Sequence, residues 1–165
     1  MIKKTRIIVG ADEAGADYKN AIKEVLEADN RVELVIDVSP LETDSRFYPE
    51  IAVMAAQRLA AGEADRGILI CGTGLGMAIT ANKVPGIRAV TAHDGYSVER
   101  SVLSNNAQFL CMGQRVIGLE LAKHLVNIWL SLSFDDASPS AVKVAQINSY
   151  DSDRLLLDAN NTKCD

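Results

Sequence analysis

A cysteine directly precedes a glycine-rich stretch in the segment GILICGTGLGMA, which covers residues 67–78. Three glycines alternate with other residues between Cys71 and Met77, so the backbone can turn tightly and present its N–H groups. A helical pattern starts at Met77, and the N-terminus of a helix favours both an anion and the thiolate form of a nearby cysteine. Cys71 is therefore a candidate base or nucleophile beside a predicted anion site.

The glycine pattern alone does not identify a ligand. It lacks the GxGxxG spacing that binds dinucleotides and the Gly-Lys-Ser/Thr of a Walker loop. A tight turn without a ligand is one alternative for this segment. A buried cysteine that merely ends a strand is the alternative for Cys71.

Polar residues follow three other apolar runs of the chain. Asp12 is a candidate ligand of a hydroxyl group, or else the cap of the next helix. His93 is a candidate acid–base group, or else a helix cap or a partner of Asp94. Arg115 is a candidate phosphate ligand, or else a surface arginine paired with a carboxylate.

Strands and helices must bring these candidate residues together in space. Apolar residues with the spacing of strands and of helices alternate along the chain. Pro49 suits the first turn of one predicted helix and Gly62 suits its end. The spacing predicts strands over 5–11, 31–38, 66–71, 87–92 and 108–113, and helices over 14–28, 48–64, 77–84, 97–104, 118–134 and 140–148.

Strands separated by helices of this length predict an α/β fold with a parallel sheet covered on both faces. Right-handed crossovers then give a Rossmann-like three-layer α/β/α sandwich around a five-stranded parallel sheet. Ligands of such sheets bind beyond the carboxyl ends of the strands. Asp12, Cys71, His93 and Arg115 all follow predicted strands, so we expect them at one edge.

The composition limits the class of protein. With 165 residues, 48% hydrophobic and 24% charged, the chain is typical of one soluble globular domain. A net charge of -5 argues against nucleic acid as a partner. No apolar run is long enough to cross a membrane, and the N-terminus lacks a signal-peptide pattern, so we expect no membrane partner and a cytoplasmic location.

The three cysteines have neither a disulfide pattern nor a CxxC zinc pattern. Cys111 has the setting of a small apolar residue within a strand, and Cys164 lies in a polar segment. We expect one domain over residues 1–148, followed by a C-terminal tail or dimer arm over residues 149–165.

Several segments resemble one known family. They are VGADEAG, YPEIA, GILICGTGLGMAITANKVPGIRAV and HDGYSVERSVLSNNAQFLCMGQRVIG, within a likeness that covers residues 6–147. The sequence resembles ribose-5-phosphate isomerase type B and the related galactose-6-phosphate isomerase subunits. The resemblance implies a Rossmann-like, metal-free enzyme without a cofactor. It also implies a homodimer or tetramer whose active sites, at the subunit interface, interconvert aldose and ketose phosphates through a cis-enediolate.

The resemblance also assigns roles to residues. Cys71 matches the base that moves the proton, and Thr73 matches part of the anion hole for the enediolate oxygen, a type of site that depends on preorganised N–H donors. The remaining residues that match substrate-binding positions of the family, or stand in their place, are Asp12, Glu13, Tyr48, Gly72, Gly74, Leu75, Gly76, His93, Ser104, Asn105, Arg115 and Lys143.

The chain departs from the family pattern at four positions. Glu13 replaces a substrate-binding histidine, and Ser104 replaces the histidine that opens the sugar ring. Lys143 and Pro139 stand where two phosphate-binding arginines are usual. Met77 occupies the position of the glutamate base that some members use, which leaves Cys71 as the expected base.

Ser104 indicates the substrate. A serine hydroxyl is a poor acid–base group near neutral pH, whereas a tetrose 4-phosphate cannot form a furanose and needs no ring opening. The segment HDGYSVERSVLSNNAQ is also similar to the branch that converts erythrulose 4-phosphate to erythrose 4-phosphate. We expect this reaction, with ribose 5-phosphate as the alternative substrate, for which another residue, such as His93, could open the ring. A non-catalytic anion-binding module is the alternative class.

Overall fold

The computed structural model describes residues 4–39 and 46–161, with residues 152–161 described by their helical backbone alone. The strands are β1 (Thr5–Ala11), β2 (Val32–Asp37), β3 (Arg66–Cys71), β4 (Ala89–Thr91) and β5 (Phe109–Gly113). The helices are α1 (Ala16–Glu27), α2 (Tyr48–Ala60), α3 (Leu75–Ala81), α4 (Gly95–Leu103), α5 (Leu119–Ser131) and α6 (Ala141–Asn161).

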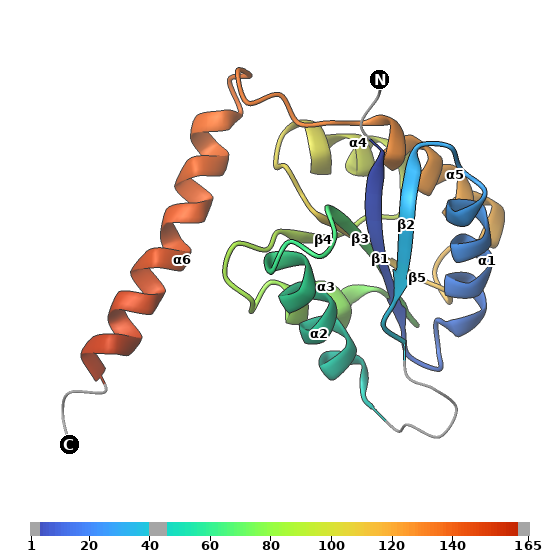
Figure 1. The fold of residues 1–165 in the computed structure, drawn as a ribbon, viewed down its shortest axis with the longest axis horizontal. Coiled ribbons are helices and arrows are strands. Elements are labelled where there is room, and N and C mark those ends of the chain that lie inside the picture. Colours follow the sequence, from blue (N-terminus) through green and yellow to red (C-terminus); the bar gives the residue numbers. More distant parts are fainter. Residues whose placement is uncertain (1–3, 40–45, 162–165) are drawn as a thin grey trace.

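The strands form one parallel sheet in the order β2-β1-β3-β5-β4. From β1 the chain passes to β2 on one side, and it then returns to β3 on the other side of β1. The crevice at the carboxyl ends of β1 and β3 is therefore the place where such a fold binds ligands. The predicted Rossmann-like α/β fold is confirmed (Figure 1).

Helices cover both faces of the sheet, which gives three layers (Figure 1). Side chains of α1, α4 and α5 pack on one face, and side chains of α2 and α3 pack on the other. Alternation along β3 sends Ile68 and Ile70 to the first face, and Leu69 and Cys71 to the second. The face on which Cys71 lies is thus fixed by the strand period.

The ends of the elements follow local signals. Pro49 lies in the first turn of α2, and Gly62, with φ of 80°, follows its end, as expected. Helix α3 begins at Leu75, ahead of the expected start at Met77. Helix α6 spans Ala141–Asn161 and so crosses residue 149, where we expect the tail or arm to begin.

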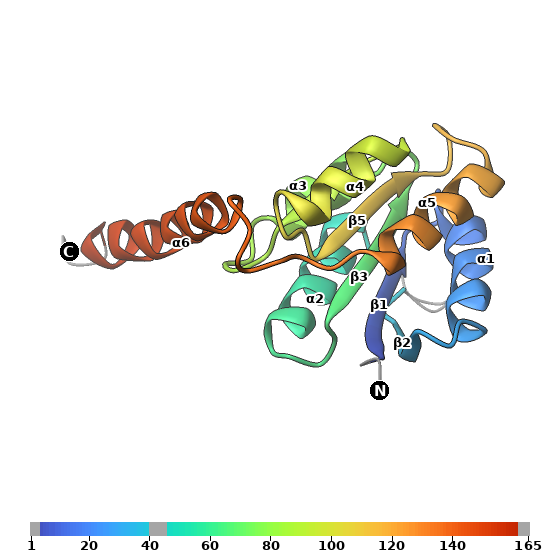
Figure 2. The same cartoon turned by 90° about the horizontal axis from the view of Figure 1, so that it is seen from above.

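Helix α6 extends away from the rest of the described fold (Figures 1 and 2). In its first half, Val144 is buried, the Gly86 N–H donates to Asp151 Oδ2 at 2.7 Å, and Arg88 Nη1 donates to Asn148 Oδ1 at 2.7 Å. Among the described residues, no helix has the length and apolar character needed to cross a membrane.

Gly15 provides a test of the packing beneath the site. A Cβ at this N-cap of α1 would lie 2.5 Å from the Ile70 carbonyl oxygen, whereas a Cβ at Gly118, the N-cap of α5, meets no atom within 4 Å. We predict that Gly15→Ala lowers the free energy of unfolding by roughly 1–3 kcal/mol more than Gly118→Ala, as overpacking does. Urea unfolding measures both, and equal losses would contradict the close approach of α1 to β3.

Candidate active site

Cys71 lies at the carboxyl end of β3, next to the crevice between β1 and β3. Its residue is 6% exposed, and its Sγ accepts a hydrogen bond of 3.0 Å from the backbone N–H of Gly74. A backbone donor of the glycine-rich segment therefore points at the sulfur atom. The glycine-rich segment therefore turns back over the sulfur atom.

The turn depends on Gly74. This residue has φ of 77°, and a Cβ here would lie 2.8 Å from the carbonyl carbon of Met112. The Gly74 carbonyl oxygen accepts a hydrogen bond of 3.0 Å from Thr91 Oγ1 at the end of β4. Glycine is thus required for both the backbone conformation and the close approach of β5.

The segment that follows β5 is bonded to the glycine-rich segment. The Gln114 N–H donates to the Cys71 carbonyl oxygen at 3.0 Å, and the Arg115 N–H donates to the Gly72 carbonyl oxygen at 3.1 Å. A Cβ at Gly113 would lie 2.6 Å from Thr73 Cα, so the two backbones touch. The sequence reasoning missed Gly113 and Gln114, although a glycine at the end of a strand is a signal of close backbone approach.

Arg115 lies beside Gly72, since a Cβ built on Gly72 would be 3.4 Å from Arg115 Cδ and 3.5 Å from Nη1. Its side chain is exposed at the carboxyl edge of the sheet. The guanidinium is also close enough to Asp12 to favour the ionised form of that carboxyl group. The structure thus brings Arg115, Asp12 and Cys71 to one edge, as predicted.

Asp12 presents an unsatisfied acceptor. Its Oδ1 is buried and has no hydrogen-bond partner among the described residues. Burial raises the pKa of the Asp12 carboxyl, while the backbone N–H groups of Ala14 and Gly15 and the charge of Arg115 oppose this rise. Glu13 beside it is exposed and makes no ion pair with any described residue. A hydroxyl group of a ligand would satisfy Asp12.

Tyr48 covers the start of α3. A Cβ on Gly76 would lie 2.5 Å from Tyr48 Cε2 and 2.9 Å from its hydroxyl oxygen, so the ring rests on this glycine. Tyr48 is 40% exposed and the neighbouring Leu75 is 57% exposed. Both side chains therefore border the open side of the glycine-rich segment. Thr73 is exposed there too, and its Oγ1 accepts a hydrogen bond of 3.4 Å from the Leu75 N–H.

His93 holds the end of β5. Its Nε2 accepts a hydrogen bond of 2.9 Å from the Gly113 N–H, which requires the neutral imidazole. Burial lowers the pKa of His93, and the nearby carboxylate of Asp94 opposes the shift. Asp94 itself caps α4 by accepting from the Ser97 N–H. His93 is therefore neither the cap of α4 nor free at Nε2.

Cys111 is fully buried on the same face of the sheet as Cys71. Burial raises the pKa of its thiol far above the ordinary value, and the neighbouring Cys71 adds to the rise. Of these two cysteines, only Cys71 adjoins the open edge. Cys164 lies outside the described residues.

Three expected site residues lie elsewhere in the fold. Helix α4 starts beyond the carboxyl end of β4 and runs back along the sheet. Ser104 and Asn105 follow its nine residues, so they lie about 13 Å along the helix axis from its first residue. Ser104 Oγ accepts from Arg100 Nε at 3.0 Å and from Nη2 at 2.7 Å, and Asn105 Nδ2 donates to the Arg100 carbonyl oxygen at 3.1 Å. Lys143 is exposed on α6.

The expected site residues therefore form two groups that lie in different parts of the fold. The carboxyl edge holds Asp12, Glu13, Tyr48, Cys71, Gly72, Thr73, Gly74, Leu75, Gly76, His93 and Arg115. Ser104 and Asn105 lie toward the amino edge, where Asn105 and α6 border a pocket of about 340 Å³. Within the described ranges, no group of three or more His, Cys, Asp or Glu side chains could hold a metal ion.

The bond from Gly113 to His93 predicts a pH dependence of stability. Because the folded state lowers the pKa of His93, this contribution is complete above about pH 6.5 and is lost as the pH falls through the lower folded value. We predict that His93→Gln, whose Oε1 accepts without titrating, shows a smaller loss of unfolding free energy between pH 7.5 and 5.5. Urea unfolding at both pH values measures this. Equal losses in both proteins would contradict the bond.

Comparisons with known proteins find similar sequences and structures. D-erythrulose-4-phosphate isomerase 2 of Mycolicibacterium smegmatis is 61% identical over 147 residues, which are 88% of this chain and 97% of that protein. D-erythrulose-4-phosphate isomerase of Pectobacterium atrosepticum is 45% identical over 146 residues, 88% of this chain and 94% of that protein. The structure of ribose-5-phosphate isomerase B of Clostridium thermocellum matches with a TM-score of 0.83 and 38% identity, over 90% of this chain and 99% of that one.

The family model described as Ribose/Galactose Isomerase matches residues 7–147. This range begins within β1, contains every element from α1 to α5 and ends in the first part of α6. It also contains Cys71, the glycine-rich segment and Arg115. The chain is therefore a sugar-phosphate isomerase and belongs to the ribose/galactose isomerase family.

Proposed function

We propose that this isomerase interconverts D-erythrulose 4-phosphate and D-erythrose 4-phosphate. The observation that carries the proposal is the state of Ser104, whose hydroxyl accepts two hydrogen bonds from Arg100 where the family resemblance expects a ring-opening histidine. A hydroxyl held in this way neither takes nor gives a proton near neutral pH. The two D-erythrulose-4-phosphate isomerases that resemble the chain support the same substrate.

The chemistry of the substrate fits this arrangement. In a tetrose 4-phosphate the terminal oxygen carries the phosphate, so no hydroxyl group is left to close a furanose ring. The carbonyl group is then available without catalysed ring opening. A pentose 5-phosphate keeps a free hydroxyl on C4 and cyclises, so its isomerase benefits from an acid–base group at the position of Ser104.

In the proposed reaction, Cys71 is the base. The thiolate removes a proton from C1 of the ketose, which gives a cis-enediolate. The proton of the C1 hydroxyl group passes to the C2 oxygen, and the thiol returns its proton to C2, which gives the aldose and restores the thiolate. The hydrogen bond from the Gly74 N–H supports the ionised sulfur. Thr73 and the neighbouring backbone N–H groups bind the enediolate oxygen, and such donors lower the barrier by a few kcal/mol each.

The remaining groups at the carboxyl edge bind the rest of the sugar. Asp12 has a buried, unsatisfied Oδ1 that a sugar hydroxyl would fill. Arg115 supplies a guanidinium for the phosphate, and Tyr48 covers the open side. The carboxylate of Glu13 stays away from the phosphate, because like charges repel.

We also propose that the enzyme is a cytoplasmic homodimer, without a cofactor, whose active site lies between the subunits. Ser104 and Asn105 follow α4 toward the amino edge of the sheet, whereas Cys71 lies at the carboxyl edge, so a second copy would have to bring such residues to one substrate. Helix α6 extends from the fold and exposes Val142, Ile147 and Tyr150, which is what an arm that packs on a second copy would do. Lys143 lies on the same helix and would contribute a charge for phosphate.

Ribose 5-phosphate is the second candidate substrate, because the fold matches that of a ribose-5-phosphate isomerase B. His93 is one residue that could open the ring. Its Nε2 is already engaged with the Gly113 N–H, which leaves only the opposite ring nitrogen available. The geometry therefore favours the four-carbon substrate.

A panel of sugar phosphates tests the substrate and the base together. We predict a higher kcat/KM for D-erythrulose 4-phosphate than for ribose 5-phosphate, and a loss of roughly 10²–10⁴-fold on every substrate in Cys71→Ala. Ser104→His is the matched variant, and it should increase the relative rate with ribose 5-phosphate. A higher kcat/KM of the wild type for ribose 5-phosphate would contradict the proposed substrate. Near wild-type turnover by Cys71→Ala would contradict the assignment of Cys71 as the base.

A further inference from the structure

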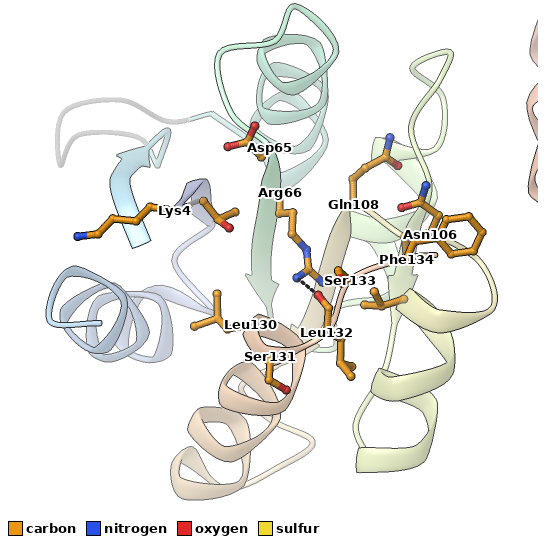
Figure 3. A pocket seen from close by; sticks show the side chains of 13 residues that line it. Lys4, Asp65, Arg66, Asn106, Gln108, Leu130, Ser131, Leu132, Ser133 and Phe134 are labelled. Carbon is orange, nitrogen blue, oxygen red and sulfur yellow. Dashed lines mark hydrogen bonds between the residues drawn. The ribbon is translucent and has the colours of Figure 1, made fainter. Parts of the chain in front are cut away.

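A second pocket lies at the amino edge of the sheet, opposite the edge that holds Cys71. It has a volume of about 370 Å³, in the range of small-molecule sites. The start of β3, the end of α5 and the segment before β5 enclose it (Figure 3). Its walls combine apolar side chains, such as Leu130 and Phe134, with the polar side chains of Arg66, Asn106 and Ser133.

Arg66 has the central position in this pocket (Figure 3). Its guanidinium lies over the Trp129 ring, with 3.5 Å between Cζ and the ring centroid. Nη1 donates to the carbonyl oxygens of Trp129 at 2.8 Å and of Leu132 at 3.1 Å. One edge of the guanidinium therefore holds the end of α5.

The other edge of the guanidinium has no hydrogen-bond partner among the described residues. Nη2 of Arg66 is buried without a hydrogen bond, and both hydrogen bonds given for this side chain come from Nη1. Burial lowers the pKa of Arg66, although a guanidinium stays protonated at neutral pH. A buried charged donor left unpaired is unfavourable, so this edge has an unmet requirement for an acceptor.

The neighbouring carboxylate does not meet this requirement. Asp65 binds Arg6 through both oxygens, at 2.9 Å from Nη2 and 3.2 Å from Nε. Its side chain points away from the guanidinium of Arg66 in Figure 3. Lys4 adds a second cationic group among the lining residues, and no ion pair forms between it and any described residue.

We propose that this pocket binds a small oxyanion, a phosphate or a carboxylate group, on the Nε–Nη2 edge of Arg66. The parallel N–H groups of this edge match the two oxygens of either anion. Asn106 supplies an amide at the wall of the pocket. The site is separate from the carboxyl edge and does not depend on the proposed function.

Trp129 provides the signal for the test, because it is the only tryptophan in the sequence. An anion on Arg66 changes the cation–π contact and therefore the tryptophan fluorescence. Inorganic phosphate and acetate are titrated separately against chloride at constant ionic strength. Arg115→Ala is used as the background, so that phosphate at the proposed active site does not contribute.

We predict a saturable change in fluorescence at millimolar phosphate or acetate. Saturation with only one of them identifies the preferred anion. Arg66→Met should abolish the change. Asn106→Gly keeps Arg66, and glycine tolerates the φ of 47° at this position. This second variant should weaken binding several-fold, and it decides the test if Arg66→Met does not fold. No saturation with either anion, or unchanged binding in folded Arg66→Met or in Asn106→Gly, would overturn the proposal.

Discussion

The contact between the ends of β3 and β5 is the constraint on which the candidate active site depends. The two strands pair within the sheet, and their chains stay bonded beyond it, because Gln114 and Arg115 donate to the carbonyl oxygens of Cys71 and Gly72. The backbones touch where Gly113 meets Thr73. The loop that carries the proposed base is thereby held in a fixed conformation. An oxyanion site needs such preorganised donors.

Neighbouring strands reinforce this contact. Thr91 at the end of β4 binds the Gly74 carbonyl oxygen, and His93 binds the Gly113 N–H. Polar side chains at the end of β4 and just after it thus position the backbone without entering the proposed reaction. Removal of a side chain here would act through the position of Cys71 and not through its chemistry.

The sequence was sufficient for the fold and for the grouping of the residues at the carboxyl edge of the sheet. The alternation of patterns predicted every strand, and the β3 range of 66–71 matches the structure. Cys71, Asp12 and Arg115 meet at one edge because parallel strands place their carboxyl ends together. The contacts of Gly113 and His93 depend on neighbours distant in the sequence, and no local pattern encodes them. Ser104 and Asn105 were expected near the substrate, and a single chain keeps them apart from Cys71 because α4 runs back along the sheet.

A mixture of two inactive variants tests most directly whether two copies build one active site. Cys71→Ala and Asn105→Ala, each inactive alone, are unfolded together and refolded as mixed dimers. If each site takes Cys71 from one subunit and Asn105 from its partner, the mixture regains about one quarter of the wild-type turnover of D-erythrulose 4-phosphate, because half of the dimers are mixed and each of those has one intact site. A mixture that stays as inactive as its components, or an Asn105→Ala protein that is fully active alone, would contradict the account.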